Sequence, residues 1–184
     1  MSNSSIGDQF EELINIVKRL RGPDGCPWDK EQTSESLISY MLEETYEVIE
    51  AIDCKDWDGL KEELGDLMLH IAFQASIAKD NGLFDISESL KNINEKLVRR
   101  HPHVFDNKNI AKENVKPTWE LQKHKEKKRD SRLDGVPISL PGIIRAQRIQ
   151  EKASHVGFDF QKEEDIWEKI KEEIEELKKK FLLN

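Results

Sequence analysis

Two consecutive stretches of this chain carry apolar residues at helical spacing, and only four residues separate them. In residues 34–52 and again in residues 57–80, the apolar positions form one continuous stripe when each residue advances 100° around a helix. The connection, Asp53 to Asp56, is short enough to predict an antiparallel pair with both stripes buried. The stripes consist of Ile38, Met41, Leu42, Thr45, Val48, Ile49 and Ile52, and of Leu60, Leu64, Leu67, Ile71, Gln74 and Ala78.

Acidic residues follow the margin of each stripe. Glu44 lies at the edge of the first stripe, and Glu47 follows it by one turn. On the second helix, Glu63, Asp66 and His70 line one border at i, i+3 and i+7. Carboxylates crowded at a helix seam repel one another and lose hydration, whereas a hard cation such as Mg²⁺ prefers oxygen ligands of this kind. The margins predict a carboxylate cage around a divalent cation. The alternative is an ordinary solvated acidic face, because 36% of the chain is charged.

Helical periodicity continues along the rest of the chain, and no convincing strand pattern is present. The fold class is therefore all-α, a helical bundle. Cys26 to Lys30 is predicted to be a loop, and residues 130–141 a linker. The further helices are predicted at residues 6–21, after an Asp85–Glu88 capping box, from Pro117 onward, at residues 143–153 and at residues 163–182.

Composition excludes several classes of protein. The net charge of −8 and the lack of a coherent basic patch argue against a nucleic-acid-binding protein. No stretch approaches 18 apolar residues and the first eight residues are polar, so neither a membrane span nor a secretory signal is expected. Cys26 and Cys54 lack the spacing of metal ligands and are interpreted as reduced thiols. We expect a cytoplasmic protein.

Several uncommon strings of residues, in order along nearly the whole chain, resemble the MazG family. The resemblance implies an all-α nucleoside triphosphate pyrophosphohydrolase that converts an NTP to the monophosphate and pyrophosphate with Mg²⁺. It divides the chain into a MazG-like domain at residues 1–129 and, at residues 130–184, a linker and the incomplete start of a second such unit. The strings are GCPWDKEQT (25–33), LEETYE (42–47), ELGD (63–66), RRHPHVF (99–105), SLP (139–141) and VGFD (156–159).

The resemblance also implies the roles of individual residues. The metal ligands would be Glu44, Glu47, Glu63 and Asp66, holding one or two Mg²⁺ ions, with Glu43 in a supporting position. Glu44 or Glu47 would orient the water that attacks the α-phosphorus. The substrate-binding residues would be Lys96, Arg100, Trp119 and Lys123. For two of these a structural role stays open, Lys96 as a surface lysine and Trp119 as a core residue.

Two other functions stay open from the sequence. One is a catalytically weak helical dimerisation or regulatory module that binds nucleotide without turnover. The other, a di-iron bundle, fits poorly because it requires Glu-x-x-His on two helices. Glu172-Glu173-x-x-Glu176 partly repeats the first acidic pattern; its spacing alone fits a surface helix with Glu and Lys pairs, whereas the resemblance implies the start of a second unit. The apolar residues of the 57–80 helix cover more than one stripe, which indicates either a buried helix or a subunit interface, and we expect a homodimer. They are Leu67, Met68, Leu69, Ile71 and Phe73.

Overall fold

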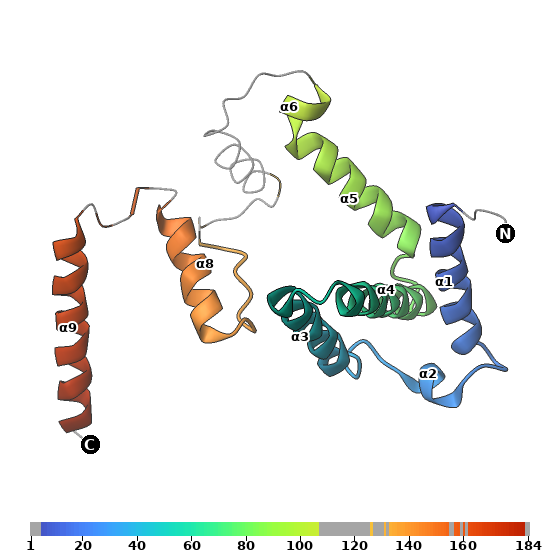
Figure 1. The fold of residues 1–184 in the computed structure, drawn as a ribbon, viewed down its shortest axis with the longest axis horizontal. Helices are drawn as coiled ribbons and strands as arrows, with labels where there is room; N and C mark the ends of the chain where they lie inside the picture. The colour runs from blue at the N-terminus through green and yellow to red at the C-terminus, as the bar shows by residue number, and fades with distance from the viewer. Residues whose placement is uncertain are drawn as a thin grey trace. The chain divides into compact units, whose positions relative to one another are not determined.

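The computed structural model describes residues 5–106, 126, 131, 133–154, 157–158, 160 and 162–182. Every regular element within these ranges is an α-helix, which confirms the predicted all-α class (Figure 1). The chain divides into two compact units, Met1–Leu97 and Val98–Asn184, so that α5 crosses the division. The domain boundary expected after residue 129 stays a prediction. The helices are α1 (Ile6–Leu20), α2 (Pro27–Glu31), α3 (Ile38–Cys54), α4 (Trp57–Asp80), α5 (Ile86–Arg100), α6 (Pro102–Phe105), α8 (Gly142–Ser154) and α9 (Glu163–Leu182).

The first unit is organised around α4, which packs against both α1 and α3 (Figure 1). Its core lies where α1 crosses the C-terminal half of α4. Leu37, which directly precedes α3, fills the same core. Burial of such side chains provides most of the stability of a helix pair of this size. The core consists of Val17, Leu37, Ala72, Phe73 and Ile77, with Leu13, Ile14 and Leu69 packed against it.

A tight turn joins α3 to α4. Lys55 adopts the left-handed conformation, with a φ of 56°, and ends α3. Asp56 caps α4, since its Oδ1 accepts a hydrogen bond from the Gly59 N–H at 3.1 Å. The predicted N-cap is therefore confirmed. Because only these two residues separate the helices, α3 and α4 run antiparallel and residues close to the turn on one helix face residues close to it on the other.

Most of the apolar stripe of α3 is not buried, contrary to the sequence prediction. Ile38, Met41, Leu42, Ile49 and Ile52 are all exposed, with Ile38 at 56% and Ile52 at 49%. The reason is that α4 is the helix against which α3 mainly packs among the described elements, so the part of its apolar face turned away from α4 stays uncovered. Apolar side chains spread over several turns of one helix form a surface that another molecule can cover.

A short helix stands where a loop was predicted before α3. Pro27 occupies the first turn of α2, a position that suits a residue without an N–H group. Arg21 holds this segment, because its Nη1 donates to the carbonyl oxygens of Asp29, at 2.9 Å, and Gln32, at 3.3 Å. Its Nη2 pairs with Asp80 at the end of α4, at 3.0 Å. One guanidinium thus ties α2 to the end of α4.

Gly25→Ala is expected to destabilise the protein by about 2 to 3 kcal/mol, because a Cβ at this glycine would lie 2.0 Å from the Leu20 carbonyl oxygen. The neighbouring Cys26 N–H bonds that same oxygen at 2.8 Å, so the backbone has no room to move away. Gly65→Ala is the matched control. Nothing lies within 4 Å of its added Cβ, and a helical alanine should raise stability by up to about 1 kcal/mol. Urea unfolding measures the stability of both variants. A Gly25→Ala midpoint equal to that of wild type would contradict the turn geometry.

In the second unit, α9 begins and ends at the predicted residues. Its apolar residues, predicted to lack a partner, are exposed among the described residues; they are Ile166, Ile170, Ile174 and Leu177. Gly157 has a φ of 80°, in agreement with the predicted turn before this helix. Within the described part of the chain, every helix is too short or too polar to span a membrane.

Candidate metal centre

Three carboxylates from the two antiparallel helices lie together at the seam between α3 and α4. Glu44, Glu63 and Asp66 each offer an oxygen atom, and these three atoms all lie within 4.8 Å of one another. All three residues are half-buried. Glu63 and Asp66 are one turn apart on α4, so both side chains leave the helix on the side where Glu44 approaches from α3. The predicted meeting of the two acidic margins is thus observed for these three residues.

The electrostatics of the cluster are unfavourable for three ionised carboxylates. The pKa of Glu44 is raised to about 7, first by burial and then by the nearby charges of Asp66 and Glu47. The pKa of Glu63 is also raised, by burial and by the charge of Glu47. Within the described part of the chain, no lysine or arginine forms an ion pair with any of these acids. The negative charge is therefore left for another group to neutralise.

A hard divalent cation fits this arrangement. Such ions take carboxylate and water oxygens as ligands, and convergent oxygen donors without a cationic side chain are the expected donor set. A cation would favour the ionised form of each carboxyl group and so reverse the effect that raises the Glu44 pKa. The donor set therefore fits a magnesium-type ion.

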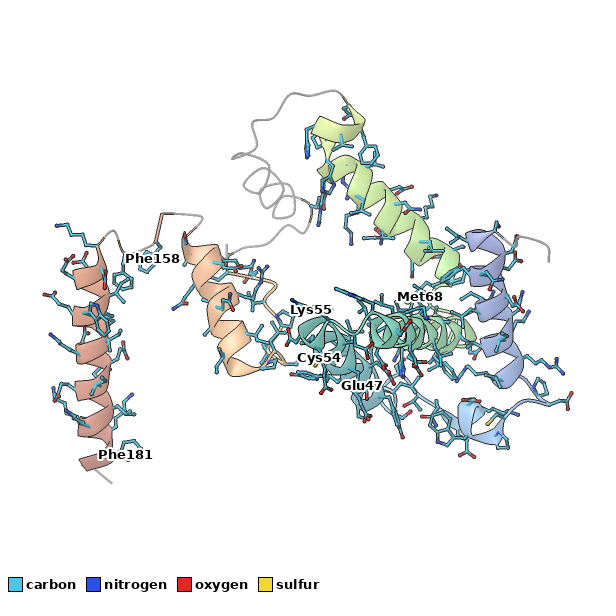
Figure 2. The ribbon with its side chains drawn as sticks, viewed as in Figure 1. Glu47, Cys54, Lys55, Met68, Phe158 and Phe181 are labelled. Carbon is cyan, nitrogen blue, oxygen red and sulfur yellow. The ribbon has the colours of Figure 1, made fainter. Side chains whose placement is uncertain are left out.

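Glu47 lies beside the three clustered carboxylates and is not one of them. It is the exposed member of the predicted ligand set, one turn after Glu44 on α3 (Figure 2). Its charge nevertheless raises the pKa of both Glu44 and Glu63, which places it close to both. Glu43, predicted to have a supporting role, is exposed on the same helix.

His70 lies on the same side of α4 as Glu63 and Asp66 and is more deeply buried than either. Only 9% of the residue is exposed, and its Nε2 lies 4.0 Å from Oε1 of Glu44. Burial lowers the pKa of its imidazole, and the charge of Asp66 opposes that shift. The sequence indicated its position on the acidic margin, but not that it would be among the most buried polar residues.

The predicted substrate-binding residues are distributed over both units. Lys96 is half-buried on α5 in the first unit, whereas Arg100 belongs to the second unit, and Trp119 and Lys123 lie outside the described residues. Arg100 is only 6% exposed, and its Nε donates to Oε2 of Glu126 at 3.0 Å.

Glu126 was not anticipated from the sequence. Its second oxygen accepts a hydrogen bond from Nε of Arg99 at 2.6 Å, so one carboxylate joins two consecutive arginines. These bonds lower its pKa to about 2. No sequence signal indicated this pairing, because 26 residues separate Arg100 from Glu126.

Comparison with known proteins identifies the family. The nucleoside triphosphate pyrophosphohydrolase/pyrophosphatase MazG of Thermotoga maritima is 49% identical over 175 residues, which cover 94% of this chain and 67% of that protein. The chain belongs to the MazG family. A sequence profile described as the MazG nucleotide pyrophosphohydrolase domain matches residues 32–105, the segment that contains all four acids. The membership predicted from the sequence strings is therefore confirmed.

Two further similarities support the family assignment. The nucleoside triphosphate pyrophosphohydrolase of Escherichia coli K12 is 45% identical over 175 residues, covering 92% of this chain and 66% of that protein. The crystal structure of a mazG-related protein from Thermotoga maritima superposes with a TM-score of 0.53 and 31% identity, over 61% of this chain and 97% of that one. The chain spans about two thirds of the length of these curated relatives.

Proposed function

We propose that this chain is a nucleoside triphosphate pyrophosphohydrolase that depends on a divalent cation, Mg²⁺, held by the acidic cluster of α3 and α4. The observation that carries the proposal is the convergence of Glu44, Glu63 and Asp66, none of which pairs with a lysine or arginine among the described residues. The relatives from Thermotoga maritima and Escherichia coli are named for this activity, and they match over most of the chain.

The chemistry requires a water molecule to attack the α-phosphorus. The bond from that phosphorus to the bridging oxygen breaks, and monophosphate and pyrophosphate leave. A bound divalent cation supplies neutralisation of the phosphate charge and makes water more acidic. Glu44 or Glu47 orients the attacking water and takes its proton.

Positive groups are needed for the triphosphate tail, and the chain offers them near the end of α5. We assign substrate binding to Lys96, Arg100 and Lys123, with Trp119 against the base or ribose. Because Arg100 is held by Glu126, its guanidinium is already oriented before substrate arrives. A phosphate oxygen would share or replace the carboxylate as its partner.

Product analysis by anion-exchange chromatography tests the reaction. The protein is incubated with a panel of NTPs and dNTPs, with Mg²⁺ or with EDTA. We expect monophosphate and pyrophosphate in equal amounts, and only when Mg²⁺ is present. Diphosphate and phosphate would contradict attack at the α-phosphorus. Nucleotide-dependent thermal stabilisation without any product would favour a nucleotide-binding module.

We also propose a homodimer formed through the exposed apolar residues of α3 and α4. Met68 and Ile71 on α4 are nearly half exposed, as is Ile49 on α3. In the view of Figure 2, Met68 lies on the upper side of this helix pair and Glu47 on the lower side. Because Met68 is two residues from Asp66 on α4, about 160° away around the helix, a partner that covers Met68 would leave Asp66 accessible.

Met68→Glu is expected to convert the dimer to a monomer, because the charge would have to be desolvated at the interface. Analytical ultracentrifugation measures the change in mass. Lys61→Glu is the matched control, since this side chain on the same helix is 78% exposed and should leave the dimer intact. A wild-type protein that sediments as a monomer at all concentrations would contradict the proposed interface.

A further inference from the structure

His70 is a buried imidazole with unfulfilled hydrogen-bonding capacity at the inner edge of the acidic cluster. Its Nδ1 is buried without a hydrogen-bond partner among the described residues, and its Nε2 lies 4.0 Å from Oε1 of Glu44. A buried ring nitrogen with no acceptor beside it is best left unprotonated, which places the proton of a neutral imidazole on Nε2, the nitrogen nearer to Glu44.

The location of His70 on α4 relates it to the cluster. It follows Asp66 by one turn, and helical residues four apart lie on the same face. One turn further on, Gln74 donates to the carbonyl oxygen of Ser34 at 3.1 Å, which holds the segment before α3. Along this face of α4, His70 therefore lies between the carboxylates of the cluster and the hydrogen bond of Gln74, which has a structural role. Glu44 has Glu63 and Asp66 as neighbours in the cluster and His70 as a further polar neighbour.

The geometry makes His70 a neighbour of the cation site and not a ligand in it. The three oxygens that converge within 4.8 Å belong to Glu44, Glu63 and Asp66, and the imidazole is not part of that group. A neutral imidazole has one N–H donor and one acceptor nitrogen. Such a donor can bind an ionised carboxylate without adding positive charge that would repel a cation.

We propose that His70 is a positioning residue that donates from Nε2–H to Oε1 of Glu44 and fixes this carboxylate for the divalent cation. The 4.0 Å separation must shorten by about 1 Å to reach a normal hydrogen bond, a movement within the rotamer freedom of a glutamate side chain. Hydrogen bonds to metal-ligating carboxylates orient the ligand, and their loss typically weakens metal affinity by about 10- to 100-fold. This inference rests on the proposed function, because it assumes that the cluster holds a cation.

Mn²⁺ binding, followed by electron paramagnetic resonance, tests the proposal without any measurement of turnover. His70→Leu removes the donor and keeps an apolar side chain in the buried site. We expect its Kd for Mn²⁺ to rise by about 10- to 100-fold. His70→Gln keeps an N–H donor, and its Kd should stay within about 3-fold of the wild-type value. Thermal unfolding in EDTA should show no loss of stability for His70→Leu, because the orphaned nitrogen is gone.

The possible results distinguish an error in the role of His70 from an error in the cation site itself. Wild-type protein that binds no Mn²⁺ would contradict the cation site itself. Wild-type protein that binds Mn²⁺, with an unchanged Kd in His70→Leu, would overturn the role of His70 alone. Equal weakening in the Leu and Gln variants would also overturn it, because the donor would then be irrelevant. If His70→Leu does not fold, His70→Phe, which keeps a planar ring without a donor, takes its place in the same comparison.

Discussion

Glu63→Gln is expected to lower kcat for NTP hydrolysis by about 10²- to 10³-fold. Glu63 provides one of the three convergent oxygens, and glutamine replaces its charge with a neutral amide of the same shape. The substitution should weaken both cation binding and the stabilisation of charge in the transition state. Steady-state kinetics at saturating Mg²⁺, with the products resolved by anion exchange, provide the measurement.

Glu62→Gln is the matched control for this substitution. Glu62 is the adjacent residue on α4, is exposed and is not part of the cluster, so kcat should stay unchanged. The two variants should also differ without metal. Removing one charge from the cluster relieves repulsion, so Glu63→Gln should unfold at a higher temperature than wild type in EDTA. Activity within about 3-fold of wild type in Glu63→Gln would show that the site is assigned to the wrong residues.

Without metal, the protein is expected to become less stable as the pH rises from about 4.5 to about 7. The pKa of Glu44 is about 7 in the folded protein and about 4.5 when unfolded, so in this window the folded state holds a proton that the unfolded state has released. The free energy of unfolding therefore falls with pH, by about 2 to 3 kcal/mol in total for this group. Urea unfolding in EDTA at several pH values measures the slope.

The His70 contribution to the free energy of unfolding changes with pH in the opposite direction from that of Glu44. The effect of Glu44 is therefore measured as the difference between wild type and a Glu44 variant. The folded pKa of His70 is lowered, and its contribution to stability is present above about 6.5 and is lost as the pH falls below that value. The difference between wild type and Glu44→Gln removes this common contribution. That difference should decline between about pH 4.5 and pH 7 in EDTA.

Addition of Mg²⁺ at pH 8 should restore stability to wild type, because a cation binds the folded state and favours ionised carboxylates. The gain should be larger at pH 8 than at pH 5, where protons compete for the same oxygens. A wild-type protein whose pH dependence matches that of Glu44→Gln, with or without Mg²⁺, would contradict the electrostatic description of the cluster.

Much of the helical framework could be predicted because its determinants are local. Asp56 caps α4 through its own side chain, and Gly157 turns the chain before α9 through its positive φ. The meeting of Glu44 with Glu63 and Asp66 was also accessible. The four-residue connection expected from Asp53 to Asp56 leaves an antiparallel pair as the simplest arrangement, and 3.6 residues per turn then determine which side chains face each other.

Features that depend on long-range packing were not accessible from the sequence. The periodicity of α3 shows which side is apolar, but not whether this chain or another molecule covers it, and Ile38 and Ile52 are in fact exposed. Likewise, the pairing of Arg100 with Glu126 depends on a contact 26 residues away. The burial of His70 was also not predicted, because its spacing from Glu63 and Asp66 places it at the margin of the stripe and does not show how deeply that margin is covered.

The acidic residues that would bind the cation and the basic residues that would bind phosphate come from different parts of the chain. The candidate cation ligands all come from one helical hairpin, whereas the predicted phosphate-binding residues follow it at the end of α5 and beyond. Loss of an acid should therefore remove cation binding and turnover together. Loss of one of the predicted phosphate-binding lysine or arginine side chains should raise KM for the nucleotide and leave Mn²⁺ affinity unchanged.

Hydrolysis in ¹⁸O-labelled water shows which phosphorus atom the water attacks. The wild-type protein is incubated with an NTP and Mg²⁺ in H₂¹⁸O. The products are then separated, and mass spectrometry measures the ¹⁸O content of each. If water attacks the α-phosphorus at the carboxylate site, one ¹⁸O atom appears in the nucleoside monophosphate, none appears in pyrophosphate, and Glu63→Gln yields almost no labelled product. Label in pyrophosphate would show attack at the β-phosphorus, and undiminished labelling in Glu63→Gln would show that Glu63 is not part of the catalytic site.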